Sequence, residues 1–142
     1  MDLLTPELRE RLTANAAARA EAMRCDAPEP DPVPVVKFFN PCGAATWLLT
    51  ELESDGDRLF GLCDLGFGCP ELGSVSLAEI ASVRVPLGLG IERDLHFSAS
   101  FPLSVYAEAA RRHGRIVESA DVLADTALWL ETERQMLPPS PP

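Results

Sequence analysis

The sequence predicts an α+β protein, in which an antiparallel sheet of about four strands forms a meander and is packed by helices on one face. Segments rich in β-branched and aromatic residues, separated by turn signals, occupy residues 35–98. Helical apolar periodicity flanks this region on both sides, which predicts an N-terminal and a C-terminal helix. The 142 residues are 46% apolar, enough for a core without disulfides or metals.

Four regions are expected along the chain. They are an N-terminal helix in 1–24, a proline-rich linker in 25–34, a single α+β domain in 35–137 and a disordered tail in 138–142. The helix should span residues 6–24, because Thr5 suits the cap and Pro6 suits the first helical position. Its apolar stripe is formed by Leu4, Leu8 and Leu12.

Three strands are expected at residues 35–39, 46–52 and 58–65. The Asp55-Gly56 pair between the last two is typical of a hairpin turn. Alternation in the second strand predicts two opposed faces. One face carries Leu48, Thr50 and Leu52, and the other carries Trp47 and Leu49.

Further elements follow in the second half of the chain. We expect a loop at 66–73, a helix at 77–82, a fourth strand at 91–98 and helices at 102–113 and 119–136. Ser76 and Glu79 form a capping box at the first of these helices, and Gly114 is a natural helix end. The aromatic and leucine residues expected in the core or along a surface groove are Phe38, Trp47, Phe60, Leu95 and Phe97.

Charge excludes several classes of function. The net charge is −10, from 22 acidic and 12 basic residues, and the basic cluster Arg111, Arg112 and Arg115 is small. Direct nucleic-acid binding is therefore not expected, because it requires a clustered positive surface. Acidity also disfavours anionic membranes, and the N-terminus lacks the pattern of a signal peptide. A cytoplasmic location is expected, in which the four cysteines stay reduced.

Three residues are candidates for binding: Trp47, Glu71 and Arg93. Arg93 falls on the apolar side of the predicted fourth strand, where a charge requires a partner. Glu71 or Glu51 could form that ion pair and fix the preceding loop to the sheet. Alternatively, Arg93 could line a pocket for an anionic ligand. If Trp47 is exposed beside Arg93, the two would form an interface.

Two groups of residues are candidates for metal or redox chemistry. Glu92, Asp94 and His96 project from one side of the predicted fourth strand and could hold a divalent metal or perform acid–base chemistry. The favoured interpretation of these three is a solvent-facing polar side of the sheet, because alternation alone predicts it. A zinc site is disfavoured because the potential ligands lack the usual pair spacing of two to four residues. Those ligands would be Cys42, Cys63, Cys69 and His96. A redox role for Cys63 or Cys69 stays open, and no cofactor is expected.

The chain resembles the bacterial domain of unknown function 2958 over residues 3–12 and 36–97. The runs that carry the resemblance are Leu3 to Glu7, Lys37 to Pro41, Thr46-Trp47 with Glu51, Leu59 to Leu62, Glu71 to Gly73, Ser76 to Ile80, and Ile91 to Asp94 with Phe97. The resemblance implies a small stand-alone domain, often encoded on plasmids and integrative elements. It implies no activity and no catalytic residues.

These observations predict a non-catalytic protein-interaction module, an accessory factor of a mobile genetic element, whose partner is a protein. Known nucleophile motifs such as Gly-x-Ser-x-Gly do not occur in the sequence. One alternative is a DNA mimic that inhibits a DNA-binding protein, which would require the carboxylates to form a single stripe. A second alternative is a metal-dependent enzyme that uses Glu92, Asp94 and His96. The oligomeric state stays open.

Overall fold

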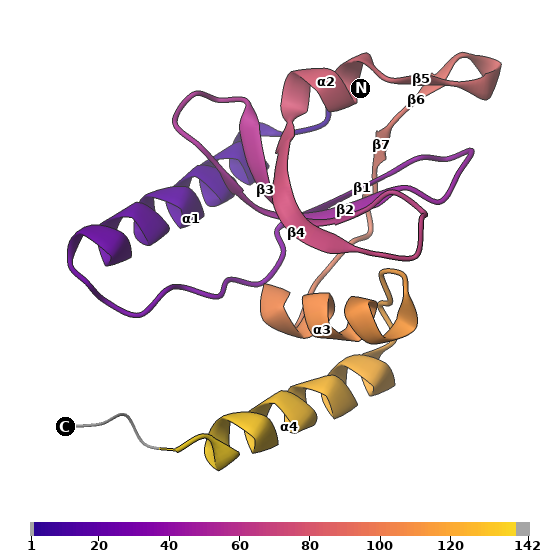
Figure 1. The fold of residues 1–142 in the computed structure, drawn as a ribbon. Helices are drawn as coiled ribbons and strands as arrows, with labels where there is room; N and C mark the ends of the chain where they lie inside the picture. Colours follow the sequence, from indigo (N-terminus) through magenta and orange to yellow (C-terminus); the bar gives the residue numbers. More distant parts are fainter. Residues whose placement is uncertain (1, 139–142) are drawn as a thin grey trace.

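The computed structural model describes residues 2–138 and confirms the α+β class (Figure 1). A five-stranded sheet has the order β4-β3-β2-β1-β7, so that the predicted three-stranded meander is extended at one edge by β4 and at the other by β7, which lies within the predicted fourth strand. Its strands are β1 (Val36–Phe39), β2 (Thr46–Leu52), β3 (Arg58–Asp64), β4 (Glu71–Ser76) and β7 (Glu92–Arg93). The helices are α1 (Pro6–Arg24), α2 (Leu77–Ser82), α3 (Leu103–His113) and α4 (Ala120–Met136). A small separate hairpin pairs β5 (Arg84–Val85) with β6 (Leu89–Gly90) around the 3₁₀ turn Pro86–Gly88.

Helices cover both faces of the sheet, so the prediction of helices on one face is wrong (Figure 1). On one face, Leu12 of α1 is buried with Phe38 and Leu49. On the other, α3 buries Tyr106 with Leu48, and α4 packs on α3. The physical reason lies in β2, where six of the seven residues are buried. A strand that is apolar on both faces needs a layer on each side.

A β-bulge interrupts β2 at Thr50. The pairing with β3 runs to Leu49 and resumes at Glu51, which leaves Thr50 outside the regular register. Its carbonyl oxygen accepts a hydrogen bond of 2.9 Å from Asn15 Nδ2 of α1. The extra residue returns Leu52 to the core that contains Leu49. The prediction that Leu52 shares a face with Thr50 is therefore wrong, because simple alternation does not anticipate a bulge.

Part of the predicted loop 66–73 belongs to a strand. β4 begins at Glu71 and pairs along its whole length with β3, with Gly73 opposite Gly61. The Pro and Gly residues here are typical of turns, yet Pro70 only precedes the strand and Gly73 lies within it. Gly61 is needed because β2 and β3 approach each other closely at this point. A Cβ on Gly61 would lie 2.1 Å from the carbonyl oxygen of Leu48.

Most of the predicted strand 91–98 does not form. Only the two residues of β7 pair with β1, opposite Phe39 and Phe38, and the backbone N–H of Asp94 adds one hydrogen bond of 3.0 Å to the carbonyl oxygen of Lys37. The chain then turns, and the Asp94 carboxylate accepts a hydrogen bond of 2.9 Å from the backbone N–H of His96. Leu95, which was expected in the core or along a groove, is 65% exposed. Lys37 and Val36 of β1 continue in the direction in which residues 94 and 95 would pair, so the strand ends because the chain turns away at Asp94.

The capping predictions are confirmed. Thr5 Oγ1 accepts a hydrogen bond of 3.2 Å from the backbone N–H of Leu8 at the start of α1. Ser76 Oγ likewise accepts from the N–H of Glu79, also at 3.2 Å, at the start of α2. Gly114 ends α3 with a φ of 70°, a left-handed conformation that suits glycine.

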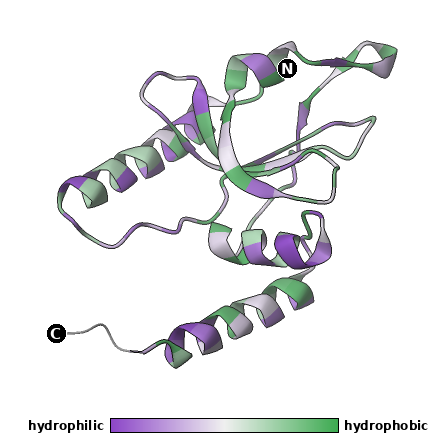
Figure 2. Ribbon diagram, viewed as in Figure 1, coloured by the Kyte–Doolittle hydropathy of each residue, from purple (hydrophilic) through white to green (hydrophobic). Residues whose placement is uncertain are grey.

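Polar and apolar residues are interleaved along the helices (Figure 2). Within residues 2–138, none of the helices has the length and apolar character that crossing a membrane requires. Of the predicted disordered tail, positions 139–142 lie outside the described residues.

Candidate functional site

The three predicted binding residues lie in one row across the sheet. Arg93 pairs with Phe38, Phe38 with Trp47, Trp47 with Cys63, and Cys63 with Glu71. Residues that pair across strands point to the same face. The row crosses all five strands, so Arg93 and Glu71 are about 19 Å apart at a strand spacing of about 4.8 Å. The structure therefore aligns these residues without bringing them together.

Arg93 fastens the N-terminal segment to the sheet. Its Nη1 donates to the carbonyl oxygens of Leu3 at 2.7 Å and Asp2 at 3.1 Å. The predicted ion pair of Arg93 with Glu71 or Glu51 does not form. Two backbone acceptors beside β7 satisfy the guanidinium instead, which is a structural role.

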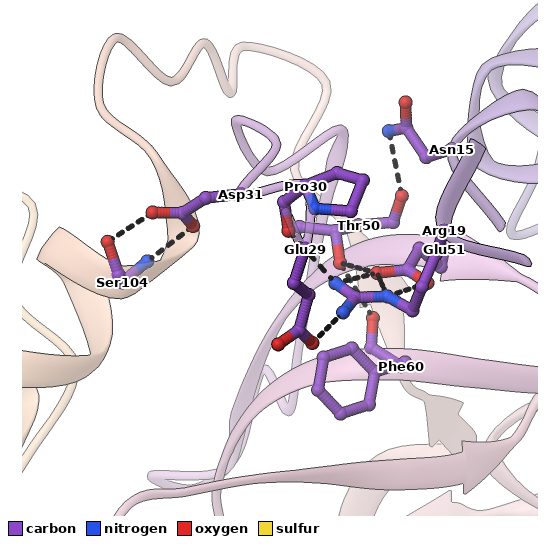
Figure 3. Close-up of polar contacts among 9 residues, drawn as sticks. All are labelled: Asn15, Arg19, Glu29, Pro30, Asp31, Thr50, Glu51, Phe60 and Ser104. Carbon is purple, nitrogen blue, oxygen red and sulfur yellow. Dashed lines mark hydrogen bonds and ion pairs between the residues drawn. The ribbon is translucent and has the colours of Figure 1, made fainter. Parts of the chain in front are cut away.

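Glu51 pairs with Arg19, which comes from α1 (Figure 3). Arg19 Nε lies 2.7 Å and 2.9 Å from the two carboxylate oxygens of Glu51, and Arg19 Nη2 lies 2.7 Å from one of them. The guanidinium is also 5.6 Å from the ring centroid of Phe60. The hydrogen bond with Glu51 is the main cause that raises the pKa of Arg19. This bidentate ion pair joins α1 to the bulged strand.

The same arginine holds the linker. Arg19 donates to the Glu29 carboxylate and to the carbonyl oxygen of Pro30 (Figure 3). Next along the linker, the Asp31 carboxylate accepts from the backbone N–H and the hydroxyl of Ser104 at the start of α3. Together these contacts form a structural joint among α1, β2, the linker and α3. Both Glu51 oxygens are occupied, so this carboxylate is not free for acid–base chemistry.

Sequence reasoning missed Arg19 and Asn15. The signal was present, because Leu8, Leu12, Asn15 and Arg19 follow one another at spacings of three or four residues along a single helix face. Polar residues that continue an apolar helix stripe indicate polar partners on the surface against which the helix packs. The bulge and the buried Glu51 supply those partners.

A groove of about 590 Å³ runs along β3 and β4. Its apolar lining is formed by Trp47, Leu65, Val75, Ile80 and Val83, and its polar lining by Asp55, Asp57, Arg58, Ser74, Ser76 and Glu79. Arg58 begins β3 and Leu65 directly follows its other end. At about 3.4 Å per residue, these two positions are about 24 Å apart. The end at Leu65 is apolar, whereas the end at Arg58 holds the charged residues together with Val75, which lies opposite Leu59.

Trp47 brings a hydrogen-bond donor to the apolar end of the groove. The side chain is only 7% exposed. Among the residues 2–138, its indole N–H makes no hydrogen bond, and no fully buried side-chain nitrogen or oxygen is left without a partner. The indole nitrogen therefore reaches solvent, and Trp47 lines the groove. An almost buried donor beside an apolar surface is a feature of binding sites.

The candidate metal ligands and redox thiols do not come together in one site. Because β7 ends at Arg93, Asp94 and His96 do not continue a strand from Glu92. Within the part of the chain that the structure describes, His, Cys, Asp and Glu side chains form no group of three that could hold a metal ion. Burial raises the pKa of the Cys63 thiol to about 11, which disfavours the reactive thiolate.

Residues 3–117 match a family described as Protein of unknown function (DUF2958). The chain belongs to this family. The matched region of the DUF2958 member extends beyond the resembling runs to include the linker and α3, and it ends before α4. Neither the curated proteins nor the solved structures include a match to the chain.

Proposed function

We propose that this DUF2958 member is a cytoplasmic, non-catalytic protein-interaction module, the accessory factor of a mobile genetic element, and that it binds its partner through the groove. The observation that carries the proposal is the groove itself, in which the unpaired indole donor of Trp47 lies beside an apolar floor. The mobile-element role rests on the family resemblance alone.

The shape and chemistry of the groove favour a polypeptide over a small metabolite. It extends along most of β3 and is shallow enough for its serine and charged residues to lie at the surface. Its lining contains neither cysteine nor histidine. Side chains of a partner could occupy the apolar end while the backbone of the partner stays near the rim.

The test begins with a library of random linear peptides displayed on phage and selected on the purified chain. Fluorescence anisotropy then gives the affinity of the enriched peptides for the wild-type chain and for Val75→Glu, which places a charge in the groove. We expect the variant to bind at least about tenfold more weakly, as for loss of a central apolar contact.

The matched control is Leu128→Glu, the same change in charge on α4, where Leu128 is 69% exposed. This variant should bind as the wild type does. Equal binding by Val75→Glu and the wild type, or failure to enrich any peptide, would contradict the proposed function.

A further inference from the structure

The two edges of the sheet differ in their exposure. At one edge, β7 has only two residues, and Arg93 ties the N-terminal segment beside it. At the other edge, β4 has six residues. Residues 71–75 make no backbone hydrogen bond outside the ladder with β3, and β4 lies at the front of the sheet with no element before it (Figure 1).

The sequence of β4 does not protect this edge. Proteins usually block open edges with a lysine, a proline, a bulge or a very short strand. Residues 72–76 (LGSVS) contain neither charge nor proline, and their pairing with β3 is regular. Leu72 is 50% exposed. In an antiparallel pair, every second residue of an edge strand directs its N–H and C=O outward, so β4 presents free backbone donors and acceptors.

The charged groups at the two ends of β4 determine which kind of strand can pair with this edge. Glu71 is exposed at the first end of β4. At the other end, the Asp57 carboxylate accepts hydrogen bonds from Ser76 Oγ at 2.7 Å and Ala78 N at 2.8 Å, and Glu79 lines the groove close by. Arg58 lies opposite Ser76 in the register, and its Nε is 3.7 Å from the Glu53 carboxylate. An uncharged strand is therefore flanked by acidic groups at both ends.

We infer that β4 binds an extended segment of a partner protein as a sixth strand, and that this segment carries lysine or arginine on each side of an uncharged core. One face of the added strand would contact Leu72, and the other would contact Val75 at the groove. A second copy of this chain fits less well, because antiparallel pairing of two β4 strands places the acidic groups of one copy beside those of the other. The inference rests on the proposed function and adds the conformation and charge of the partner.

The test uses three synthetic peptides and NMR of the ¹⁵N-labelled full chain. The first peptide is KKVTVTVKK, the second has glutamate in place of lysine, and the third is the first with alternate backbone nitrogens methylated on one edge. The lysine peptide should shift the amide signals of residues 72–76 and slow their hydrogen exchange. The glutamate peptide should bind at least about tenfold more weakly, and methylation of the pairing edge should abolish binding.

Two variants complete the design. Leu72→Lys adds a charge to the exposed edge and should weaken binding of the lysine peptide at least about tenfold, whereas Leu128→Lys should not change it. Signals that shift elsewhere, or no shift at all, would overturn the inference. Self-association that Leu72→Lys abolishes would also overturn it, since the occupant is then a second copy.

The outcomes separate the two proposals. Phage-selected peptides that depend on Val75 but tolerate backbone methylation would refute strand pairing and leave groove binding intact. Peptides that require free backbone N–H groups but bind Val75→Glu as tightly as the wild type would refute binding in the groove and leave strand pairing at β4 intact.

Discussion

The two long helices, α1 and α4, are attached to the molecule in different ways. α1 has 19 residues and packs on β2, with Leu12 fully buried and Arg19 in a bidentate ion pair. α4 has 17 residues and packs on α3, with Leu123 and Thr126 as its buried residues. α1 lies within the region matched to the family and α4 lies outside it. α1 is therefore tied into the sheet within the region matched to the family, whereas α4 lies outside that region and packs on α3.

The largest expected difference comes from one substitution made in both helices. Leu12→Ala should reduce the free energy of unfolding by about 4 kcal/mol, because the sheet holds the cavity open. Leu123→Ala should cost about 2 kcal/mol, because an outer helix can move into the space. Urea denaturation measures both values. Equal costs would contradict the comparison.

The second largest expected loss of stability comes from breaking the ion pair between Arg19 of α1 and Glu51. Arg19→Met leaves the Glu51 carboxylate, whose side chain is 6% exposed, without its cation. We expect a loss of about 3 kcal/mol in the free energy of unfolding. The double variant Arg19→Met with Glu51→Leu should recover most of this loss, since no buried charge then remains. If the single variant unfolds like the wild type, the joint described for α1 does not stabilise the fold.

On α4, the corresponding electrostatic contact is weaker. The Arg112 guanidinium lies 3.9 Å from the ring centroid of Trp129, a residue that is 40% exposed. Trp129→Leu should reduce the free energy of unfolding by only about 0.5–1 kcal/mol. Trp129→Phe keeps an aromatic ring and should retain part of the interaction. A loss from Trp129→Leu as large as that from Arg19→Met would show that α4 is as firmly attached as α1.

The smallest expected effect is a dependence of the stability on acidic pH. Hydrogen bonds from Arg111, and then from Arg112, lower the pKa of Glu108 on α3. A carboxyl group whose pKa is lowered by folding stabilises the fold at pH values above its pKa in the unfolded chain, about 4.3. This contribution is lost as the pH falls through the lower pKa of the folded state. Glu108→Gln should therefore be less stable than the wild type at neutral pH, by less than about 1 kcal/mol.

Urea denaturation of both proteins at neutral and at acidic pH measures this contribution. The difference in stability should shrink on acidification. A difference that grows toward acid would contradict the assignment to Glu108.

Sequence reasoning located the elements whose signals are local. Caps and turns located the ends of α1, α2 and α3, and β-forming residues between turn signals located β1, β2 and β3. The errors concern features that depend on distant partners. β4 forms despite Pro70 and Gly73 because β3 offers a full ladder, whereas the chain turns away from β1 at Asp94 although the alternation of residues 94–98 is regular.

The candidate site shows the same division between residues with a local sequence signal and contacts that depend on distant partners. Trp47 could be singled out as a large aromatic residue in an otherwise aliphatic strand, and it lines the groove. The partners of Arg93 and Glu51 could not be assigned, because they depend on which helix and which terminus lie against each strand. Arg19 meets Glu51 across 32 positions of sequence.

The bulge at Thr50 has a consequence for how genes of this family can vary in length. An in-frame loss of the Thr50 codon would remove the unpaired residue and leave Glu51 opposite Phe60 and Leu52 opposite Leu59, as in the present register. Such a deletion keeps every later side chain of the strand on its present face, whereas one further inserted residue would reverse those faces. In aligned relatives, loss of the residue at position 50 should therefore be tolerated, whereas single insertions should avoid residues 51–52 and accumulate instead in the exposed hairpin turn at 53–57.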